Sequence, residues 1–241
     1  INKREYLEIY EASKKLTAPH ISSYLKSKEK KIDDNFIQNL ALLTQITIKK
    51  SEVQYFHGKL LYSIVANELR ERKLDYVNIF EIGTARGFSS MCMAKALDDF
   101  KINGHIVSLD LLPHNESIYW GSISDNDGKL SRKNLLNNYK NLLNYVTYIQ
   151  SSSPIELFKL GINNINLCFI DGEHTYKSVI KESNFVAKFQ SKGDIIFFDD
   201  YNKILFPGCV KAIDEFCLKH KYDKYIIEGY KSRNFVIAKK K

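Results

Sequence analysis

Short apolar runs alternate with helical patterns over the last two thirds of the chain, and this alternation most constrains the fold. Seven runs have the length of strands: 77–82, 106–110, 146–150, 165–171, 194–199, 225–229 and 234–238. The central runs are continuously apolar, as expected for strands covered on both faces. Helical patterns separate the runs, at 89–97, 129–143, 154–160, 176–189 and 209–219. This order predicts an α/β protein with a doubly wound, Rossmann-like sheet of seven strands and right-handed crossovers.

Two connections stand out from the rest. Only a short turn, at 230–232, separates the last two runs, and strands joined in this way pair antiparallel. We therefore predict an antiparallel hairpin at one edge of the sheet. The connection 111–128 is long and polar and carries Trp120; such loops often border active sites. Trp120 either stacks on a ligand ring or anchors its own loop.

The first fifty residues follow a different pattern, which is helical and amphipathic without strand-like alternation. Asp33 and Asp34 precede an apolar series and predict a helix with an acidic first turn. A second helix is expected after Ser51, with its apolar face running from Phe56 to Leu69. We predict an N-terminal helical extension over 1–51, acting as a cap or a homo-oligomerisation element, and an α/β domain over 52–241.

The composition of the chain restricts its possible functions only weakly. The net charge of +8 is spread along the chain except at 26–31 and 239–241, so it is a poor indication of nucleic-acid binding. The longest apolar runs have strand length, which argues against a membrane span. Four scattered cysteines in apolar patterns predict buried free thiols and a reducing, cytoplasmic compartment.

The segment 80–90 predicts a ligand-binding turn between a strand and a helix. Gly83 and Gly87 allow the backbone to approach a ligand closely, and the helix start favours an electron-rich group. Asp110, at the end of the next strand, suits ribose hydroxyls in either a dinucleotide or another nucleoside site. The NAD fingerprint needs a third small residue after Gly-x-Gly, but Phe88 stands in that place. The glycine spacing therefore argues against NAD.

These motifs resemble the class I S-adenosylmethionine-dependent methyltransferases. The segment 81–87 is similar to their first motif, Glu/Asp-x-Gly-x-Gly-x-Gly, with Ala85 replacing one glycine. The segment 169–176 resembles the Asp-Gly-x-His-x-Tyr signature of one subgroup, and 193–201 resembles that subgroup's next strand. The subgroup includes bacterial macrolide sugar O-methyltransferases and cephalosporin hydroxylase-like proteins. The resemblance covers roughly 52–239.

The resemblance implies roles for individual residues. Residues of the turn, the next strand end and the loop after the third strand would bind S-adenosylmethionine: Glu81, Gly83, Thr84, Ala85, Gly87, Asp110, Ser152 and Ser153. In metal-dependent members the matching acids bind magnesium, which points to Asp171, Asp199 and Asp200. The catalytic residues would be Asp171 and His174, with His174 as the base.

Residue chemistry supports a metal-assisted site independently. Acidic residues end four of the first five strands, and their mutual repulsion needs compensation, for which a cation is one source. Magnesium prefers oxygen ligands, and a bound hydroxyl loses its proton more readily. An imidazole can accept that proton near neutral pH. Simpler interpretations remain: His174 is a capping or surface histidine, and Asp200 caps the turn before Ile204 while Asp199 alone faces the site.

We therefore predict a cytoplasmic S-adenosylmethionine-dependent O-methyltransferase that acts on a hydroxyl of a sugar or sugar-bearing small molecule, with magnesium. The alternatives are a methyltransferase of the same fold acting on a small-molecule amine or RNA, and a hydroxylase-like relative. No RRM, KH, helix-turn-helix or Asn-Pro-Pro-Tyr motif supports a specific nucleic-acid partner. Acceptor specificity is expected in the 111–128 loop and the N-terminal helices.

Overall fold

The computed structural model describes residues 2–48, 52–153 and 156–241. Its centre is a seven-stranded sheet with the order β3-β2-β1-β4-β5-β7-β6. The strands are β1 Val77–Ile82, β2 Gly104–Asp110, β3 Val146–Gln150, β4 Leu167–Ile170, β5 Ile195–Tyr201, β6 Tyr222–Ile227 and β7 Asn234–Lys240. The first five are parallel, and β7 pairs antiparallel with both β5 and β6. The predicted Rossmann-like sheet and its antiparallel edge hairpin are confirmed.

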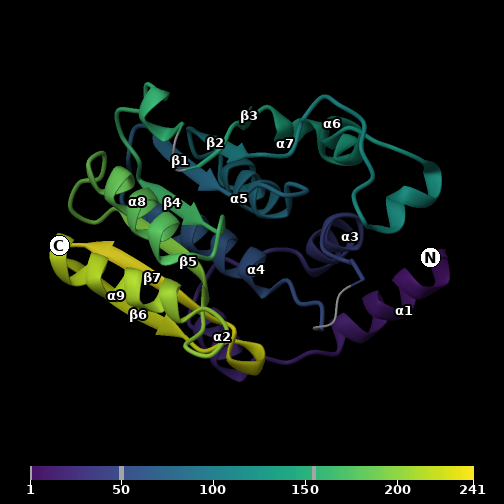
Figure 1. The fold of residues 1–241 in the computed structure, drawn as a ribbon, viewed down its shortest axis with the longest axis horizontal. Helices are drawn as coiled ribbons and strands as arrows, with labels where there is room; N and C mark the ends of the chain where they lie inside the picture. The colour runs from purple at the N-terminus through teal and green to yellow at the C-terminus, as the bar shows by residue number, and fades with distance from the viewer. Residues whose placement is uncertain (1, 49–51, 154–155) are drawn as a thin grey trace.

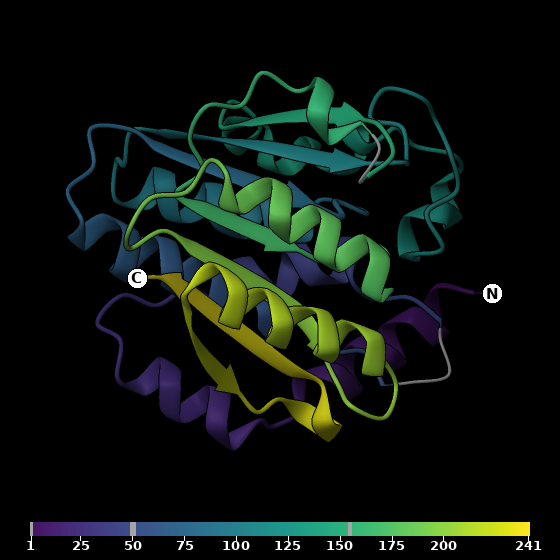
Figure 2. The same cartoon turned by 60° about the vertical axis from the view of Figure 1, so that its left-hand side comes forward.

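Helices cover both faces of the sheet (Figures 1 and 2). In β1, Ile79 packs into one apolar cluster and Phe80 into another, because successive side chains of a strand point to opposite faces. The first cluster lies under α4 (Phe56–Ser63), the π-helix η1 (Ile64–Leu69), α5 (Phe88–Asp99) and α7 (Lys140–Leu143). The second lies under α8 (Tyr176–Ala187) and α9 (Pro207–His220), which run side by side in Figure 2.

The N-terminal segment forms three helices, α1 (Lys3–Lys14), α2 (Pro19–Lys26) and α3 (Asp34–Thr44). The predicted acidic start of α3 is confirmed, since the Asp33 carboxylate accepts a hydrogen bond from the Phe36 N–H at 2.7 Å. Buried residues of these helices belong to the same apolar cluster as β1 and α5. The predicted boundary near residue 51 lies outside the described residues, and the two-domain division and the oligomerisation role stay predictions.

Two predicted helices differ in the structure. The pattern over 129–143 is broken into α6 (Arg132–Leu135), the 3₁₀ turn η3 (Asn137–Tyr139) and α7. Asparagine is the physical reason, because its side chain competes for backbone hydrogen bonds and four asparagines fall within 134–141. Of the segment 154–160, the first two residues lie outside the described part, and Leu157–Lys159 is the 3₁₀ turn η4. Two further 3₁₀ turns are η2 (Ile123–Asp127) and η5 (Tyr230–Ser232).

Two compositional expectations can also be compared with the structure. All four cysteines are buried and unpaired, as predicted. Within the described ranges, no helix is long and apolar enough to cross a membrane.

Candidate active site

The ends of β1 and β4 touch through a glycine. Gly83 has a φ of +96°, and a Cβ added to it would lie 2.0 Å from the carbonyl oxygen of Asp171. Any side chain there would collide with backbone, so the position needs glycine for both conformation and space. The ligand turn and the acidic end of β4 are therefore in direct contact.

Asp110 organises the turn that follows Gly83. One of its carboxylate oxygens accepts the Ala85 N–H at 2.7 Å, and the other accepts the Leu112 N–H at 2.7 Å. Arg132 Nε also donates to the Ala85 carbonyl, at 2.9 Å. Ala85 stands in the left-handed region at φ 45°, where the family motif has glycine. The ribose role of Asp110 stays a prediction.

Glu81 lies inside the sheet layer, fully buried. One carboxylate oxygen accepts hydrogen bonds from the hydroxyls of Ser90 and Ser108, and the other has no hydrogen-bond partner among the described residues. Burial raises the pKa of Glu81, and the serine hydroxyls oppose that rise. The Thr84 hydroxyl meets the Ser108 hydroxyl at 2.6 Å, which completes a polar network beneath the turn.

The two predicted adenine contacts lie after β3. The Ser153 hydroxyl donates to Glu182 of α8 at 2.6 Å, and the Ser152 carbonyl accepts the Glu156 N–H at 3.0 Å. Burial raises the pKa of Glu182 to about 7. Ser153 therefore has a partner within the protein, and the cofactor roles of both serines stay predictions.

A bulge in β5 separates the two acids that the sequence places side by side. The pairing of β5 with β7 shifts between Phe198 and Tyr201, and Asp200 takes a φ of 54°. Bulges commonly redirect side chains next to active sites. Asp199 consequently pairs with Arg233. Asp200 lies 3.1 Å from Arg233 with one oxygen and turns its other oxygen toward His174, beyond the end of β4.

Asp199 forms a two-pronged ion pair with Arg233. The two guanidinium–carboxylate distances are 2.5 Å and 3.1 Å, and the Asp199 side chain has no exposure. Burial opposes ionisation, but the guanidinium holds the pKa of Asp199 below its ordinary value. Both oxygens of Asp199 are thus engaged, so its predicted metal-ligand role would require Arg233 to give way.

Asp171, His174 and Asp200 converge at the ends of β4 and β5. One ligand atom from each lies within 4.8 Å of the others, and His174 Nε2 is 3.3 Å from Asp200 Oδ2. Burial and the nearby Asp199 carboxylate raise the pKa of Asp171 well above its ordinary value. Two carboxylates and an imidazole fit a divalent cation, so the donor set differs from the predicted one by His174 in place of Asp199.

The turn before Ile204 is capped by Asn202 rather than by Asp200. Asn202 Oδ1 accepts the N–H groups of Ile204 and Leu205, both at 2.9 Å. This contradicts the simpler interpretation in which Asp200 caps the turn and Asp199 alone faces the site. Asp200 is the member of the pair that joins His174.

Two residues of the site carried no signal in the sequence. Arg233 lies 34 positions after Asp199, just past the hairpin turn, and no motif marks it. His57, on α4, lies between Phe88 and Phe169, with ring centroids at 5.0 Å and 6.2 Å. Its electrostatic interaction with Asp199 helps to lower the pKa of that carboxyl group. Only their contacts in three dimensions reveal either residue.

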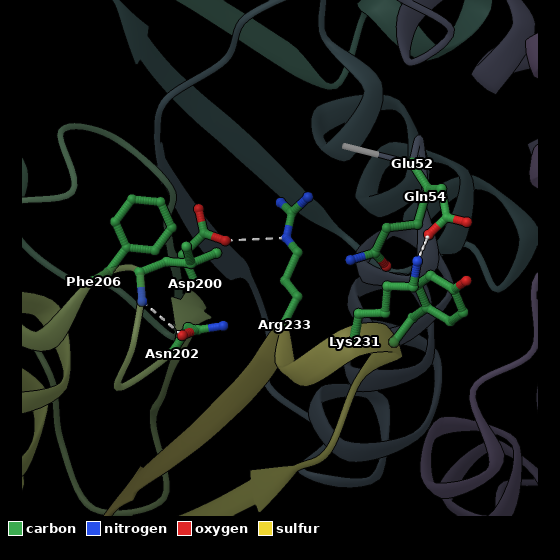
Figure 3. Close-up of a pocket in the computed structure, with 9 residues that line it drawn as sticks. Glu52, Gln54, Asp200, Asn202, Phe206, Lys231 and Arg233 are labelled. Atoms are coloured by element: carbon green, nitrogen blue, oxygen red, sulfur yellow. Dashed lines mark hydrogen bonds and ion pairs between the residues drawn. The ribbon is translucent and has the colours of Figure 1, made fainter. Parts of the chain in front are cut away.

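A cavity of about 260 Å³ opens beside the cluster (Figure 3). Its walls come from the segment before α4, the loop after β5 and the turn between β6 and β7. They comprise Glu52, Gln54, Asp200, Asn202, Leu205, Phe206, Tyr230, Lys231 and Arg233. Asp200 belongs to both the cavity wall and the cluster. We call this cavity the β5–β7 pocket.

Trp120 takes the second of its two predicted roles. Its side chain is buried, and its indole N–H donates to the Leu130 carbonyl at 2.8 Å. Arg86, from the ligand turn, donates to the Trp120 carbonyl at 2.7 Å. Trp120 therefore anchors the 111–128 loop against the turn and does not line the β5–β7 pocket.

Comparison with known proteins agrees with this geometry. A family model described as a methyltransferase domain matches residues 80–201, which include the ligand turn and the acidic cluster. An uncharacterized protein of Acanthamoeba polyphaga mimivirus is 26% identical over 174 residues, covering 71% of each chain.

Solved structures match over most of the chain. The O-methyltransferase NovP superposes with a TM-score of 0.62 at 16% identity, over 91% of this chain and 99% of that one. The O-methyltransferase TomG from Streptomyces achromogenes, solved with S-adenosylmethionine, gives 0.58 at 18% identity, over 90% and 94%. At these identities the structural matches establish the fold alone.

The fold and the matched motifs define a class I S-adenosylmethionine-dependent methyltransferase. Because the family model covers just over half of the sequence, the chain belongs to the methyltransferase domain family.

Proposed function

We propose that this enzyme transfers the methyl group of S-adenosylmethionine to a hydroxyl of a sugar or sugar-bearing small molecule in the cytoplasm. The observation that carries the proposal is the contact between Gly83 and the Asp171 carbonyl oxygen. It brings the turn that begins at Gly83 against the cluster of Asp171, His174 and Asp200, which supports a cofactor site at that turn. A methyl donor and a group that activates a hydroxyl need this adjacency, because methyl transfer requires the reacting atoms to be aligned at close range.

The donor side would use the turn residues that the family motif assigns. Gly83, Thr84, Ala85 and Gly87 would surround the methionine and ribose parts, with Asp110 at the ribose. The unpartnered oxygen of Glu81 could accept a hydrogen bond from the cofactor side. Ser152 and Ser153 remain the candidates for the adenine end.

The acceptor side would use the acidic cluster. A divalent cation held by Asp171 and Asp200 would lower the pKa of an acceptor hydroxyl. Magnesium favours oxygen ligands over nitrogen, which leaves His174 to accept the hydroxyl proton. Asp200, 3.3 Å from His174 Nε2, would orient the imidazole and stabilise its protonated form.

Calorimetry tests the cofactor half of the proposal, and product analysis tests the acceptor half. We expect S-adenosylmethionine and S-adenosylhomocysteine to bind saturably, and NAD not to bind. Product formation on a panel of hydroxyl and amine acceptors, with and without EDTA, then separates the alternatives. Chelator-sensitive methylation of a hydroxyl supports the proposal, whereas chelator-insensitive methylation of an amine or of RNA would replace it with a same-fold alternative.

A further inference from the structure

The β5–β7 pocket has a mixed wall, with apolar rings and polar groups facing one space. Phe206 and Leu205 come from the loop after β5, and Tyr230 comes from the turn between β6 and β7. A pocket of about 260 Å³ is smaller than the usual range for drug-sized ligands, so it suits a single ring. The pocket adjoins the cluster of Asp171, His174 and Asp200, because Asp200 belongs to both.

The charged residues of the pocket are already paired with one another. Lys231 and Glu52 form an ion pair at 2.5 Å. Arg233 lies 3.1 Å from Asp200 and also holds Asp199, as Figure 3 shows in part. An ionic ligand would have to compete with one of these existing pairs. The described walls therefore favour an uncharged occupant.

Gln54 is the exception among the polar groups of the wall. Its side chain is 5% exposed, and its carbonyl oxygen has no hydrogen-bond partner among the described residues. In Figure 3 its amide points toward Arg233. Asn202, the other amide in the wall, differs because its oxygen accepts two backbone N–H groups and its nitrogen donates to the Ser232 carbonyl. A buried unpaired carbonyl is unfavourable, and a hydroxyl from a bound ligand would satisfy it.

We propose that the β5–β7 pocket binds an uncharged, ring-shaped polyol, and that Gln54 recognises a hydroxyl on the ring other than the one that is methylated. One hydroxyl lies at the cluster beside Asp200 and is the one methylated, while another donates to Gln54 Oε1. The ring face packs on Phe206 and Tyr230. This inference rests on the proposed function and adds the binding site, the charge class of the acceptor and a residue that determines specificity.

The test measures binding, not catalysis. Saturation-transfer NMR is recorded on the full chain with S-adenosylhomocysteine present, using methyl glycosides of neutral hexoses and 6-deoxyhexoses as probes. Methyl glucuronide and methyl glucosaminide are the charged counterparts. We expect at least one neutral glycoside to bind, its charged counterparts to bind at least tenfold more weakly, and Gln54→Met to weaken neutral binding roughly two- to tenfold, as for one lost hydrogen bond. Equal binding by Gln54→Met, stronger binding of the charged probes, or no glycoside binding would overturn the inference.

A second measurement separates a ligand-binding amide from a structural one. Gln190 is a matched control, because it is also buried but both of its amide atoms are used, by Tyr222 and by the Ile195 carbonyl. Gln190→Met should lower the melting temperature, whereas Gln54→Met should leave it unchanged or raise it. An equal loss of stability in both variants would show that Gln54 has a structural partner and would contradict the proposal. If glycosides bind as expected but hydroxyl methylation is absent, the proposed function fails and the pocket stands.

Discussion

The proposed active site has a donor half and an acceptor half, and the two are built in different ways. The donor half is made of backbone held by backbone and nearby side chains: Gly83 fits only because it lacks a side chain, and the Ala85 N–H is fixed by Asp110. The acceptor half is made of charged side chains from distant segments, with Asp199 locked to Arg233 and Asp200 turned to His174. A backbone site is sensitive to a single added carbon, whereas a side-chain site is sensitive to a change of charge.

The largest expected effect comes from the acceptor half. His174→Asn should lower kcat by about 10²–10⁴-fold, because the proposed general base is lost, while binding of S-adenosylmethionine stays unchanged. Steady-state kinetics and calorimetry on the same variant measure the two quantities. Since His174 and the ligand turn belong to different halves, a parallel loss of cofactor binding would mean that the halves are not separable.

Loss of the Arg233 guanidinium, which neutralises Asp199, should have the next largest effect. Arg233→Met leaves a buried carboxylate unpaired and should destabilise the fold by about 3–5 kcal/mol at neutral pH. Arg233 lowers the pKa of Asp199 in the folded state, so its contribution is present at neutral pH and is lost as pH falls through that lowered pKa. Urea denaturation at pH 7 and at about pH 3, below the ordinary pKa of an aspartate, should therefore show a smaller difference in stability between wild type and variant at the lower pH. A gap that widens on acidification would contradict the pairing.

A pair of glycine substitutions tests the backbone half. Gly83→Ala should cost about 3 kcal/mol or more, because the new Cβ meets the Asp171 carbonyl oxygen in addition to the unfavourable φ. Gly128→Ala is the matched control: its φ is +97°, but nothing lies within 4 Å of the added Cβ. It should cost about 1–3 kcal/mol, for the backbone conformation alone, because a φ of 97° with a ψ of −166° is adopted almost only by glycine. An equal loss of stability in the two variants, measured by thermal denaturation, would contradict the close contact between the ends of β1 and β4.

The smallest expected effect is a gain of stability. Ala85 occupies the left-handed region at φ 45°, so Ala85→Gly should stabilise the folded chain by about 0.5–1 kcal/mol. Chemical denaturation measures the change. Restoring the family glycine should leave cofactor affinity close to that of the wild type, because Asp110 still holds the residue's N–H. A destabilised variant would mean that the methyl group of Ala85 makes packing contacts that outweigh the strain.

The sequence predicts the backbone half better than the side-chain half, for a physical reason. The strand 77–82 and the following turn are local: apolar continuity, two glycines and one acid lie within eleven residues. The division of labour between Asp199 and Asp200 depends on a bulge and on Arg233 from another strand, and neither leaves a local pattern. Gln54 likewise stands in no motif. In the segment 129–143 a local pattern is present but misleading. Its apolar spacing predicts one helix, whereas its asparagines divide it.

The turn from Tyr230 to Arg233 has an evolutionary consequence. It contributes Tyr230 and Lys231 to the pocket, and it lies at the tip of an edge hairpin, where surface loops vary more readily in sequence than the elements they connect. Arg233 at its end stays fixed by the buried acid. If the pocket binds the acceptor as proposed, natural variation in this exposed turn would change what is methylated without altering the segment proposed to bind the methyl donor.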